Sequence, residues 1–261
     1  SGDNNIDVSY CKEANIYTGD GNNNLNVRCY EDYTSNITTG AGNDVINVYN
    51  GNSVISAGAG NDNIIIKDSN SVINFNLGDG QDTIQISKSK DSNKTSVIEF
   101  GEGISWDDLE FSKETEIIDK DDWDETLEYA TFAENLVISI KGTNDKLTLR
   151  YWYGGQKGEY NSSYKYQADK LVFADGSVYT HKDIKGETFI GTDNDDIIDS
   201  TILNNIIEAK KGNDIINDPG GDDTYIFNLG DGQDIITDKN GDDTIQFGEG
   251  IKLEDLEFYR V

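Results

Sequence analysis

The sequence predicts an all-β fold, in which two solenoid blocks of parallel strands are separated by an antiparallel β capping domain. One observation is a glycine-aspartate word, such as Gly-Ala-Gly-Asn-Asp or Gly-Asp-Gly-Gln-Asp, that recurs in register with a nine-residue period. Neither a helix nor an ordinary amphipathic strand has such a period. A second is that the stretch between the two sets of repeats has the alternation of β-hairpins. A third is that apolar residues keep the nine-residue period, as at Ile37, Ile46, Ile55, Ile64 and Ile73.

The composition is strongly acidic. The chain has 261 residues, of which 50 are acidic, 21 basic and 27 glycine, and its formal net charge is −29. Nucleic acid and anionic lipid need a basic surface, so this charge argues against both and favours cations as partners. No apolar run of about 18 residues predicts a membrane span, and no basic-then-apolar leader opens the chain. Because both ends fall inside repeats, we expect a fragment of a longer protein.

Each nine-residue repeat is expected to form one turn and one short strand. Glycine allows the positive φ angles of a tight turn that exposes its carbonyl groups, and the aspartate directs a carboxylate toward them. The β-branched residues that follow, as in Val45-Ile-Asn-Val48, favour a strand. Two repeats make one coil of 18 residues, so loops 18 residues apart share an edge of the solenoid.

The aspartates that end these words are spaced to form ladders between coils. Calcium takes roughly six to eight oxygen ligands, which two stacked loops supply and a single loop does not. The predicted pairs are Asp44 with Asp62, Asp62 with Asp82, Asp196 with Asp214, Asp214 with Asp234, and Asp223 with Asp243. The residues predicted to line the calcium sites are Gly40, Gly42, Asp44, Gly58, Gly60, Asp62, Gly78, Asp79, Gly80, Asp82, Gly191, Asp193, Asp196, Gly212, Asp214, Gly221, Asp223, Gly230, Asp231, Gly232, Asp234, Gly241 and Asp243.

These words resemble the RTX, or haemolysin-type calcium-binding, nonapeptide repeats of secreted bacterial proteins, which form a parallel β-roll. The matching loops cover residues 1–86 and 189–247. The resemblance implies Ca²⁺ as the bound ion, export from a Gram-negative bacterium by the type I secretion machinery, and an extracellular location, with the cell surface as a possible site of attachment.

Some positions depart from the repeat. Asn5 and Asn23 stand where aspartate is expected, and Asn194 replaces a glycine. Asn23 with Asp44 is therefore a marginal sixth pair. The opposite edge of the first block is expected to carry small or unpaired residues and to bind little or no calcium, at Ala14, Asp32, Ser53 and Ser71.

A longer repeat sets the domain boundaries. The sequence segments 76–82 and 100–111 recur in similar form at 228–234 and 247–258. Residues 136–140 and 146–151, and then 170–173 and 177–179, are predicted hairpins. This stretch resembles the haemolysin-type calcium-binding-related domain and would cap the roll, and single helical turns are expected at 105–108 and 180–183. The predicted domains are 1–100 for the first roll, 101–188 for the cap, 189–247 for the second roll and 248–261 for the start of a second cap.

Three other motifs are interpreted as structural. His181 is the only histidine, which nearly excludes a histidine-based triad or a zinc site. The stretch Asp238–Asp243 with Glu249 mimics an EF-hand loop, but its glycine is misplaced and no helices are predicted beside it. The Asp218-Pro219 pair falls in a roll turn, where proline is an ordinary turn residue and self-cleavage is not expected.

Two cysteines and a group of aromatic residues leave alternatives open. Cys11 and Cys29 are 18 residues apart, which would place their Cα atoms roughly 4.8 Å apart on stacked rungs, as a disulfide or as two thiols. The aromatics would form a sugar-stacking surface or, as we favour, the core of the cap. They are Trp106, Trp123, Trp152, Tyr151, Tyr153, Tyr160, Tyr164 and Tyr166.

The leading hypothesis is a calcium-binding segment of a larger secreted toxin or adhesin that folds on calcium binding after export. The alternative is a module that binds a glycan or a host receptor through the aromatic-rich cap. No residue set supports catalysis, so we expect that this segment is not an enzyme.

Overall fold

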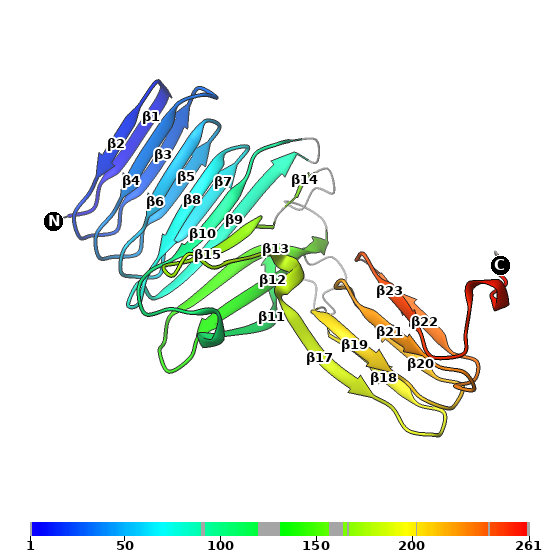
Figure 1. The fold of residues 1–261 in the computed structure, drawn as a ribbon. Helices are drawn as coiled ribbons and strands as arrows, with labels where there is room; N and C mark the ends of the chain where they lie inside the picture. Colours follow the sequence, from blue (N-terminus) through cyan, green and yellow to red (C-terminus); the bar gives the residue numbers. More distant parts are fainter. Residues whose placement is uncertain are drawn as a thin grey trace. The chain divides into compact units, whose positions relative to one another are not determined.

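The chain is built almost entirely of β-strands, in a computed structural model that describes residues 2–89, 92–119, 131–156, 164–165, 167–201, 203–239 and 241–259 (Figure 1). Parallel solenoid strands make up both ends of the chain, and antiparallel strands lie near the middle of the sequence. The predicted all-β class and its arrangement are therefore confirmed. Contacts divide the chain into two compact units, Ser1–His181 and Lys182–Val261.

The first unit is a roll of two parallel sheets. Successive strands alternate between the sheets, so strands next but one in sequence are hydrogen-bonded neighbours. One sheet contains β1 (Asn5–Cys11), β3 (Asn24–Cys29), β5 (Val45–Tyr49), β7 (Asn63–Lys67) and β9 (Gln81–Ser89). The other contains β2 (Ala14–Tyr17), β4 (Thr34–Thr38), β6 (Asn52–Ser56), β8 (Asn70–Phe75) and β10 (Ser96–Phe100).

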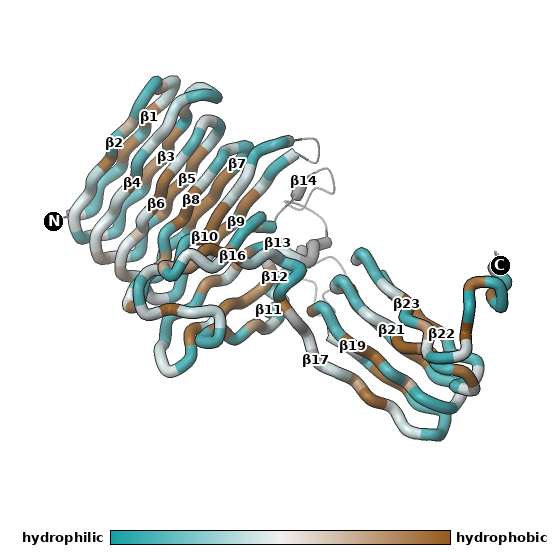
Figure 2. Tube along the Cα trace, in the orientation of Figure 1, coloured by the Kyte–Doolittle hydropathy of each residue, from teal (hydrophilic) through white to brown (hydrophobic). Residues whose placement is uncertain are grey.

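The core of this roll is the predicted isoleucine stack. Ile46 pairs in register with Ile64 on one sheet, and Ile55 with Ile73 on the other, and all four are buried. Ile37 is buried in the same row as Ile55. Figure 2 shows apolar residues recurring at the same level of successive strands. Because each strand is only four to six residues long over most of the roll, two inward side chains per strand make a narrow core.

The two predicted hairpins are confirmed, and both extend the sheets of the roll. β12 (Thr131–Ile140) and β13 (Lys146–Gln156) pair antiparallel, with β11 (Leu109–Asp119) on their outer side, and β13 adds in parallel to β9. β15 (Lys170–Phe173) pairs antiparallel with β16 (Val178–Tyr179) and in parallel with β10. A short β14 (Tyr164–Lys165) also pairs with β9. The last coil of the roll thus has no open sheet edge where these strands join it.

The helical parts are single turns. η1 (Trp106–Asp108) and η2 (His181–Asp183) lie where the capping spacing predicted them, and η3 (Leu253–Asp255) repeats η1 in the second copy. Ser105 donates its backbone N–H and its hydroxyl to the Asp108 carboxylate, at 2.9 and 2.6 Å. Within the described chain, none of the helices has the length and apolarity needed to cross a membrane.

The aromatic residues that can be placed serve the packing of the first unit. Trp106 stacks on Tyr179 with ring centroids 4.1 Å apart, and Tyr151 and Trp152 are buried. These three positions agree with the interpretation as core. The side chains of Tyr153 and Tyr164 are not described, and Trp123, Tyr160 and Tyr166 lie outside the described residues.

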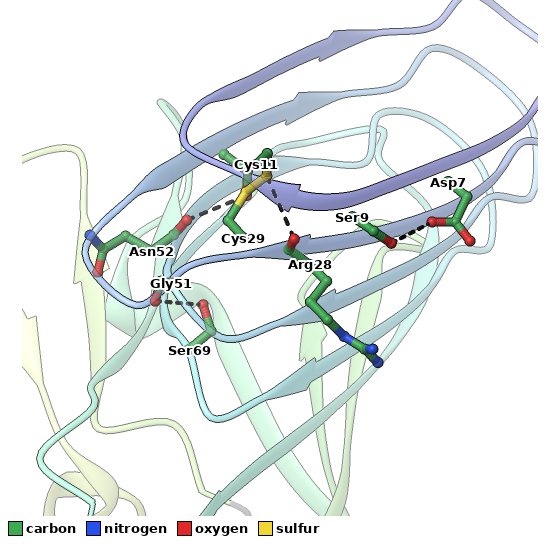
Figure 3. The surroundings of a disulfide bond; sticks show 9 residues. Asp7, Ser9, Cys11, Arg28, Cys29, Gly51, Asn52 and Ser69 are labelled. Atoms are coloured by element: carbon green, nitrogen blue, oxygen red, sulfur yellow. Dashed lines mark hydrogen bonds between the residues drawn. A yellow bond between two sulfur atoms is a disulfide. The ribbon is translucent and has the colours of Figure 1, made fainter.

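The two cysteines form a disulfide between the first two coils (Figure 3). Cys11 of β1 and Cys29 of β3 are register partners whose Cα atoms are 4.5 Å apart. Figure 3 also shows the turn beside them, where the Ser69 hydroxyl donates to the Gly51 carbonyl at 3.2 Å. The disulfide therefore ties the N-terminal strand, which has only one sheet neighbour, to the roll.

The second unit is a smaller roll of the same kind. Its core contains Ile198, Ile207, Ala209, Ile216 and Tyr225, with Phe189 packed against it. One sheet contains β17 (Lys185–Ile190), β19 (Asn204–Glu208), β21 (Thr224–Phe227) and β23 (Thr244–Phe247), and the other β18 (Ile197–Asp199), β20 (Ile215–Asp218) and β22 (Ile235–Asp238).

Candidate calcium loops

The predicted aspartate ladder of the first unit is present as a chain of hydrogen bonds between coils. The Asp44 backbone N–H donates to Oδ1 of Asp62 at 2.7 Å, and the Asp62 N–H donates to Oδ1 of Asp82 at 2.9 Å. Asn23 extends the ladder, because its backbone N–H and its side-chain amide both donate to Oδ1 of Asp44. One oxygen of each carboxylate is thus fixed by the backbone of the preceding coil.

The second oxygen of these carboxylates has a different environment. Oδ2 of Asp44, Asp62, Asp214 and Asp223 is buried and has no hydrogen-bond partner among the described residues. A buried polar atom without a partner is costly, and a carboxylate oxygen is the ligand that calcium prefers. The donor set consists of hard oxygen atoms stacked at coil spacing, so the residues present fit calcium.

Glycine is required where successive loops touch. Gly60 and Gly80 are bridged in parallel with φ angles of +154° and +98°. A Cβ on Gly80 would lie 2.0 Å from the Gly60 carbonyl oxygen, and a Cβ on Gly60 would lie 2.0 Å from the Gly42 oxygen. Any side chain there would separate the loops, so the repeated glycine keeps the aspartates of neighbouring coils within reach of one cation.

The second unit has the two other predicted ladders. The Asp196 N–H donates to Oδ1 of Asp214 at 2.8 Å, and the Asp214 N–H donates to Oδ1 of Asp234 at 3.0 Å. On the opposite edge the Asp223 N–H donates to Oδ1 of Asp243 at 3.0 Å. Asn205 was not singled out from the sequence, yet its N–H donates to Oδ1 of Asp223 at 2.6 Å. The sequence feature that could have identified Asn205 is its position, one coil of 18 residues before Asp223.

Three predicted aspartates lie in the loops but outside the ladders. Asp79 and Asp231 accept the backbone N–H of Asn76 and Asn228, three residues earlier, and so close their own turns. Asp193 is exposed and forms an ion pair with Lys211 at 3.0 Å. The predicted glycines all lie in the turns that precede the strands, at Gly40, Gly42, Gly58, Gly60, Gly78, Gly80, Gly191, Gly212, Gly221, Gly230, Gly232 and Gly241.

Two assignments of register were wrong. Asn4, not Asn5, aligns with Asn23, because the Asn4 N–H donates to Oδ1 of Asn23. Ser35, not Asp32, aligns with Ala14. The reason for the second error is that this coil contains 21 residues instead of 18, since the turn after β3 is longer.

Along the opposite edge of the first roll, hydroxyl and amide groups of neighbouring coils satisfy one another. The Ser53 hydroxyl donates to Ser71 at 3.0 Å, and the Asn70 amide donates to Asn52 at 2.8 Å. Such a ladder needs no ion, which is the physical basis for the prediction that this edge binds little or no calcium.

The pKa values of the ladder aspartates favour a bound cation. Burial raises the pKa of Asp62 to about 7 and that of Asp82 to about 8, and neighbouring carboxylates add to both shifts. Burial likewise raises the pKa of Asp234, of Asp223 and of Asp243. Without a cation, burial thus favours the protonated form of these groups, because the charged form has lost its water.

The first ladder ends on a residue that the sequence reading assigned only to a hairpin turn. Asp145, between β12 and β13, accepts the backbone N–H of Gly78 at 2.8 Å and of Gly80 at 3.2 Å. The Lys146 N–H then donates to the Gly80 carbonyl. The segment Gly142-Thr-Asn-Asp145 imitates a repeat word, which is the signal that could have identified it.

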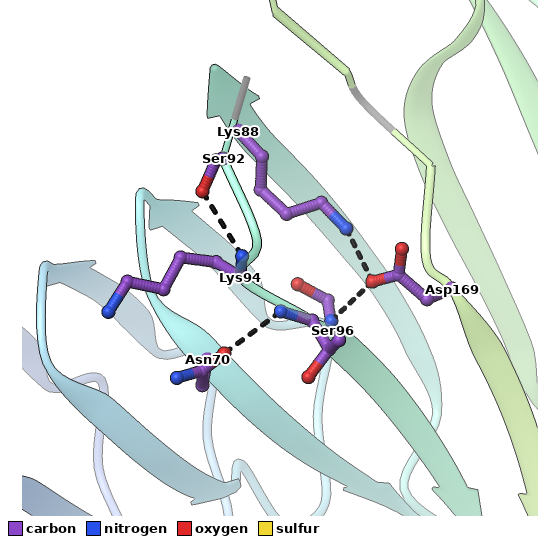
Figure 4. A network of polar contacts seen from close by, with 7 residues as sticks. Asn70, Lys88, Ser92, Lys94, Ser96 and Asp169 are labelled. Carbon is purple, nitrogen blue, oxygen red and sulfur yellow. Dashed lines mark hydrogen bonds and ion pairs between the residues drawn. The ribbon is translucent and has the colours of Figure 1, made fainter. Parts of the chain in front are cut away.

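An ion pair between a buried lysine and a partly exposed aspartate holds the same end of the roll together (Figure 4). Lys88 is almost fully buried, and its Nζ donates to Oδ2 of Asp169 at 2.5 Å. The Ser96 backbone N–H donates to the same oxygen at 2.6 Å. This contact joins β9, β10 and the segment before β15, and its charges are already paired, so its role is structural.

The interpretation of the EF-hand-like stretch as a false match is confirmed. Asp238 ends β22 and Thr244 begins β23, so strands flank this loop where an EF-hand has helices. His181 lies in η2, and Asp218 and Pro219 lie at the end of β20 and in the turn after it.

The fold and its loops define a parallel β-roll protein with stacked acidic turns. Residues 135–183 match the family model of the haemolysin-type calcium binding protein related domain. The chain therefore carries such a domain, and with the parallel solenoid around it this confirms the resemblance to RTX proteins. Together they indicate an RTX-like calcium-binding segment. A comparison with curated proteins found no match.

Proposed function

We propose that this chain is a calcium-folded β-roll segment of a larger secreted RTX protein, a toxin or an adhesin, and that the segment itself is not an enzyme. The observation that carries the proposal is the row of buried, unpartnered Oδ2 atoms at Asp44, Asp62, Asp214 and Asp223. Calcium bound there would supply positive charge to carboxylates that otherwise repel one another.

The function of such a segment is conformational. Two carboxylates about 4 Å apart repel by about 1 kcal/mol even in water, and by more where they are buried. In a cytosol poor in calcium this repulsion would keep the chain open for type I secretion. Outside the cell, millimolar calcium would neutralise the ladders, and a site with a Kd on the order of 10⁻⁴ M gains about 1.4 kcal/mol for each further tenfold excess of calcium.

Far-UV circular dichroism of the chain in chelator and in increasing calcium tests this proposal. We expect β-structure to form cooperatively in millimolar calcium, and magnesium to be a poor substitute because it demands a smaller octahedral site. Equal β-content with chelator and with calcium would contradict the switch and would leave a constitutive scaffold in its place.

A further inference from the structure

The second unit contains four neighbouring aspartates, two of which contact one tyrosine. Asp218 and Asp238 are register partners at the ends of β20 and β22, and Asp223 and Asp243 belong to the ladder beside them. One carboxylate oxygen from each of Asp223, Asp238 and Asp243 lies within 4.8 Å of the others. The Tyr225 hydroxyl lies 3.0 Å from Oδ2 of Asp218 and 2.8 Å from Oδ2 of Asp238.

The Tyr225 hydroxyl lies within hydrogen-bond distance of two carboxylates. A tyrosine hydroxyl has one proton, so Tyr225 donates to one of its two carboxylate neighbours and presents a lone pair to the other. Burial raises the pKa of Tyr225, so the hydroxyl stays protonated. Oδ1 of Asp218 is held by the Gly220 N–H at 2.9 Å, which leaves Oδ2 facing the tyrosine.

An independent observation points to a ligand. Asp223 is 1% exposed, and its Oδ2 has no hydrogen-bond partner among the described residues. This atom lies within its own glycine turn, where a Cβ on Gly221 would be 3.0 Å from it. A bound cation would stabilise the charged form of this buried carboxylate, which the surrounding oxygen atoms do not.

The extra carboxylates set this site apart from the other loops. Asp218 and Asp238 stand five residues before the ladder aspartates Asp223 and Asp243. At the same offset, the other ladders have small or apolar residues, namely Thr39, Ala57, Leu77, Gly191, Ala209 and Leu229. No other ladder site therefore has a carboxylate at this offset.

We infer that Asp218 and Asp238 join Asp223 and Asp243 in a four-carboxylate site that binds calcium, or a trivalent lanthanide in its place, more tightly than the other loops and fills first. More charged ligands give a calcium site higher affinity. This inference rests on the proposed function, since it assumes that the ladders bind calcium, and it assigns an order of filling and two further ligands.

Terbium luminescence of the whole chain tests the inference, because a tyrosine next to bound Tb³⁺ sensitises its emission. We expect the first equivalent of Tb³⁺ to give emission excited through Tyr225, and calcium to compete for this site at the lowest concentration. Asp218→Asn and Asp238→Asn should each raise the Kd of the first-filled site at least tenfold, which corresponds to about 1.4 kcal/mol. Tyr225→Phe should remove most of the emission of the first equivalent.

Asp214→Asn is the matched comparison, because it changes a ladder without the extra carboxylates. It should weaken the later sites and leave the first unchanged. If Asp218→Asn and Asp238→Asn leave the first Kd unchanged while Asp214→Asn weakens calcium binding, the inference is wrong and the proposed function stands. If no variant changes calcium binding, both are wrong. Circular dichroism in saturating calcium checks that each variant folds. If Asp218→Asn does not fold, the inference is judged on Asp238→Asn, because the Asp238 side chain is only half-buried.

Discussion

Replacing Asp62 by asparagine separates the two roles of its carboxylate. Oδ1 accepts the Asp44 N–H, which an amide oxygen can also do. Oδ2 has no hydrogen-bond partner in the described part of the chain, and the proposed function assigns it to calcium. Asp62 is shared by the pairs with Asp44 and with Asp82, so Asp62→Asn removes a ligand from two sites. Asp82→Asn removes a ligand from only one of the predicted pairs.

The magnitude follows from the loss of binding. A site filled at about 100 times its Kd contributes about 2.7 kcal/mol to the free energy of unfolding. In 10 mM calcium we therefore expect Asp62→Asn to lower the free energy of unfolding by up to about 5 kcal/mol and Asp82→Asn by up to about 3 kcal/mol. In chelator both substitutions should instead raise the free energy of unfolding, because burial raises the pKa of Asp62 to about 7 and that of Asp82 to about 8, and a neutral amide removes the cost of the buried charge.

Urea unfolding of the chain in 10 mM calcium and in chelator measures both effects. Asp32→Asn is the charge-matched control, because Asp32 is exposed in the long turn away from the ladders. The reasoning is refuted if Asp62→Asn and Asp32→Asn change the calcium dependence equally, or if Asp62→Asn destabilises the chain as much in chelator as in calcium.

Three further predictions concern pH, the disulfide and the end of the ladder. In chelator, β-content should be highest below about pH 4 and should fall as the pH rises toward 8. The reason is that raised carboxylate pKa values, about 7 for Asp62 and about 8 for Asp82, stabilise the fold when protonated; a pH titration by circular dichroism that shows no loss on raising the pH would contradict this. Replacing both Cys11 and Cys29 by serine should lower the free energy of unfolding in calcium by about 3 kcal/mol. Reductant should cause the same loss in the unmodified chain and no further loss in the variant. Asp145→Ala leaves two backbone N–H groups without their charged acceptor and should destabilise the first unit by about 3 kcal/mol in urea unfolding, with Asp145→Asn recovering part of it.

The periodic part of the structure could be predicted from the sequence because every coil repeats the same local rule. The isoleucine core and the stacking of Asp44, Asp62 and Asp82 follow from the nine-residue and 18-residue spacings. The error at Ser35 arose where one turn is longer, since spacing alone does not reveal where an insertion falls.

The rest could not be predicted because it depends on contacts outside the repeat. Asp145 reaches the ladder only because β13 adds in parallel to β9, and a hairpin pattern does not specify its neighbour. Asp218 and Asp238 meet Tyr225 because β20, β21 and β22 place them on adjacent coils. Asp218 and Asp238 stand outside the glycine-aspartate repeat, so the repeat itself does not identify them as ligands.

The two units place different demands on calcium. In the first unit one edge is acidic, while the other is a neutral ladder that includes Ser53 and Ser71 and is complete without an ion. In the second unit both edges are acidic, one through Asp214 and the other through Asp223. Its apolar core is also smaller. From the same nine-residue rule we therefore expect a first roll that calcium supports on one edge and a second roll that depends on calcium on both edges.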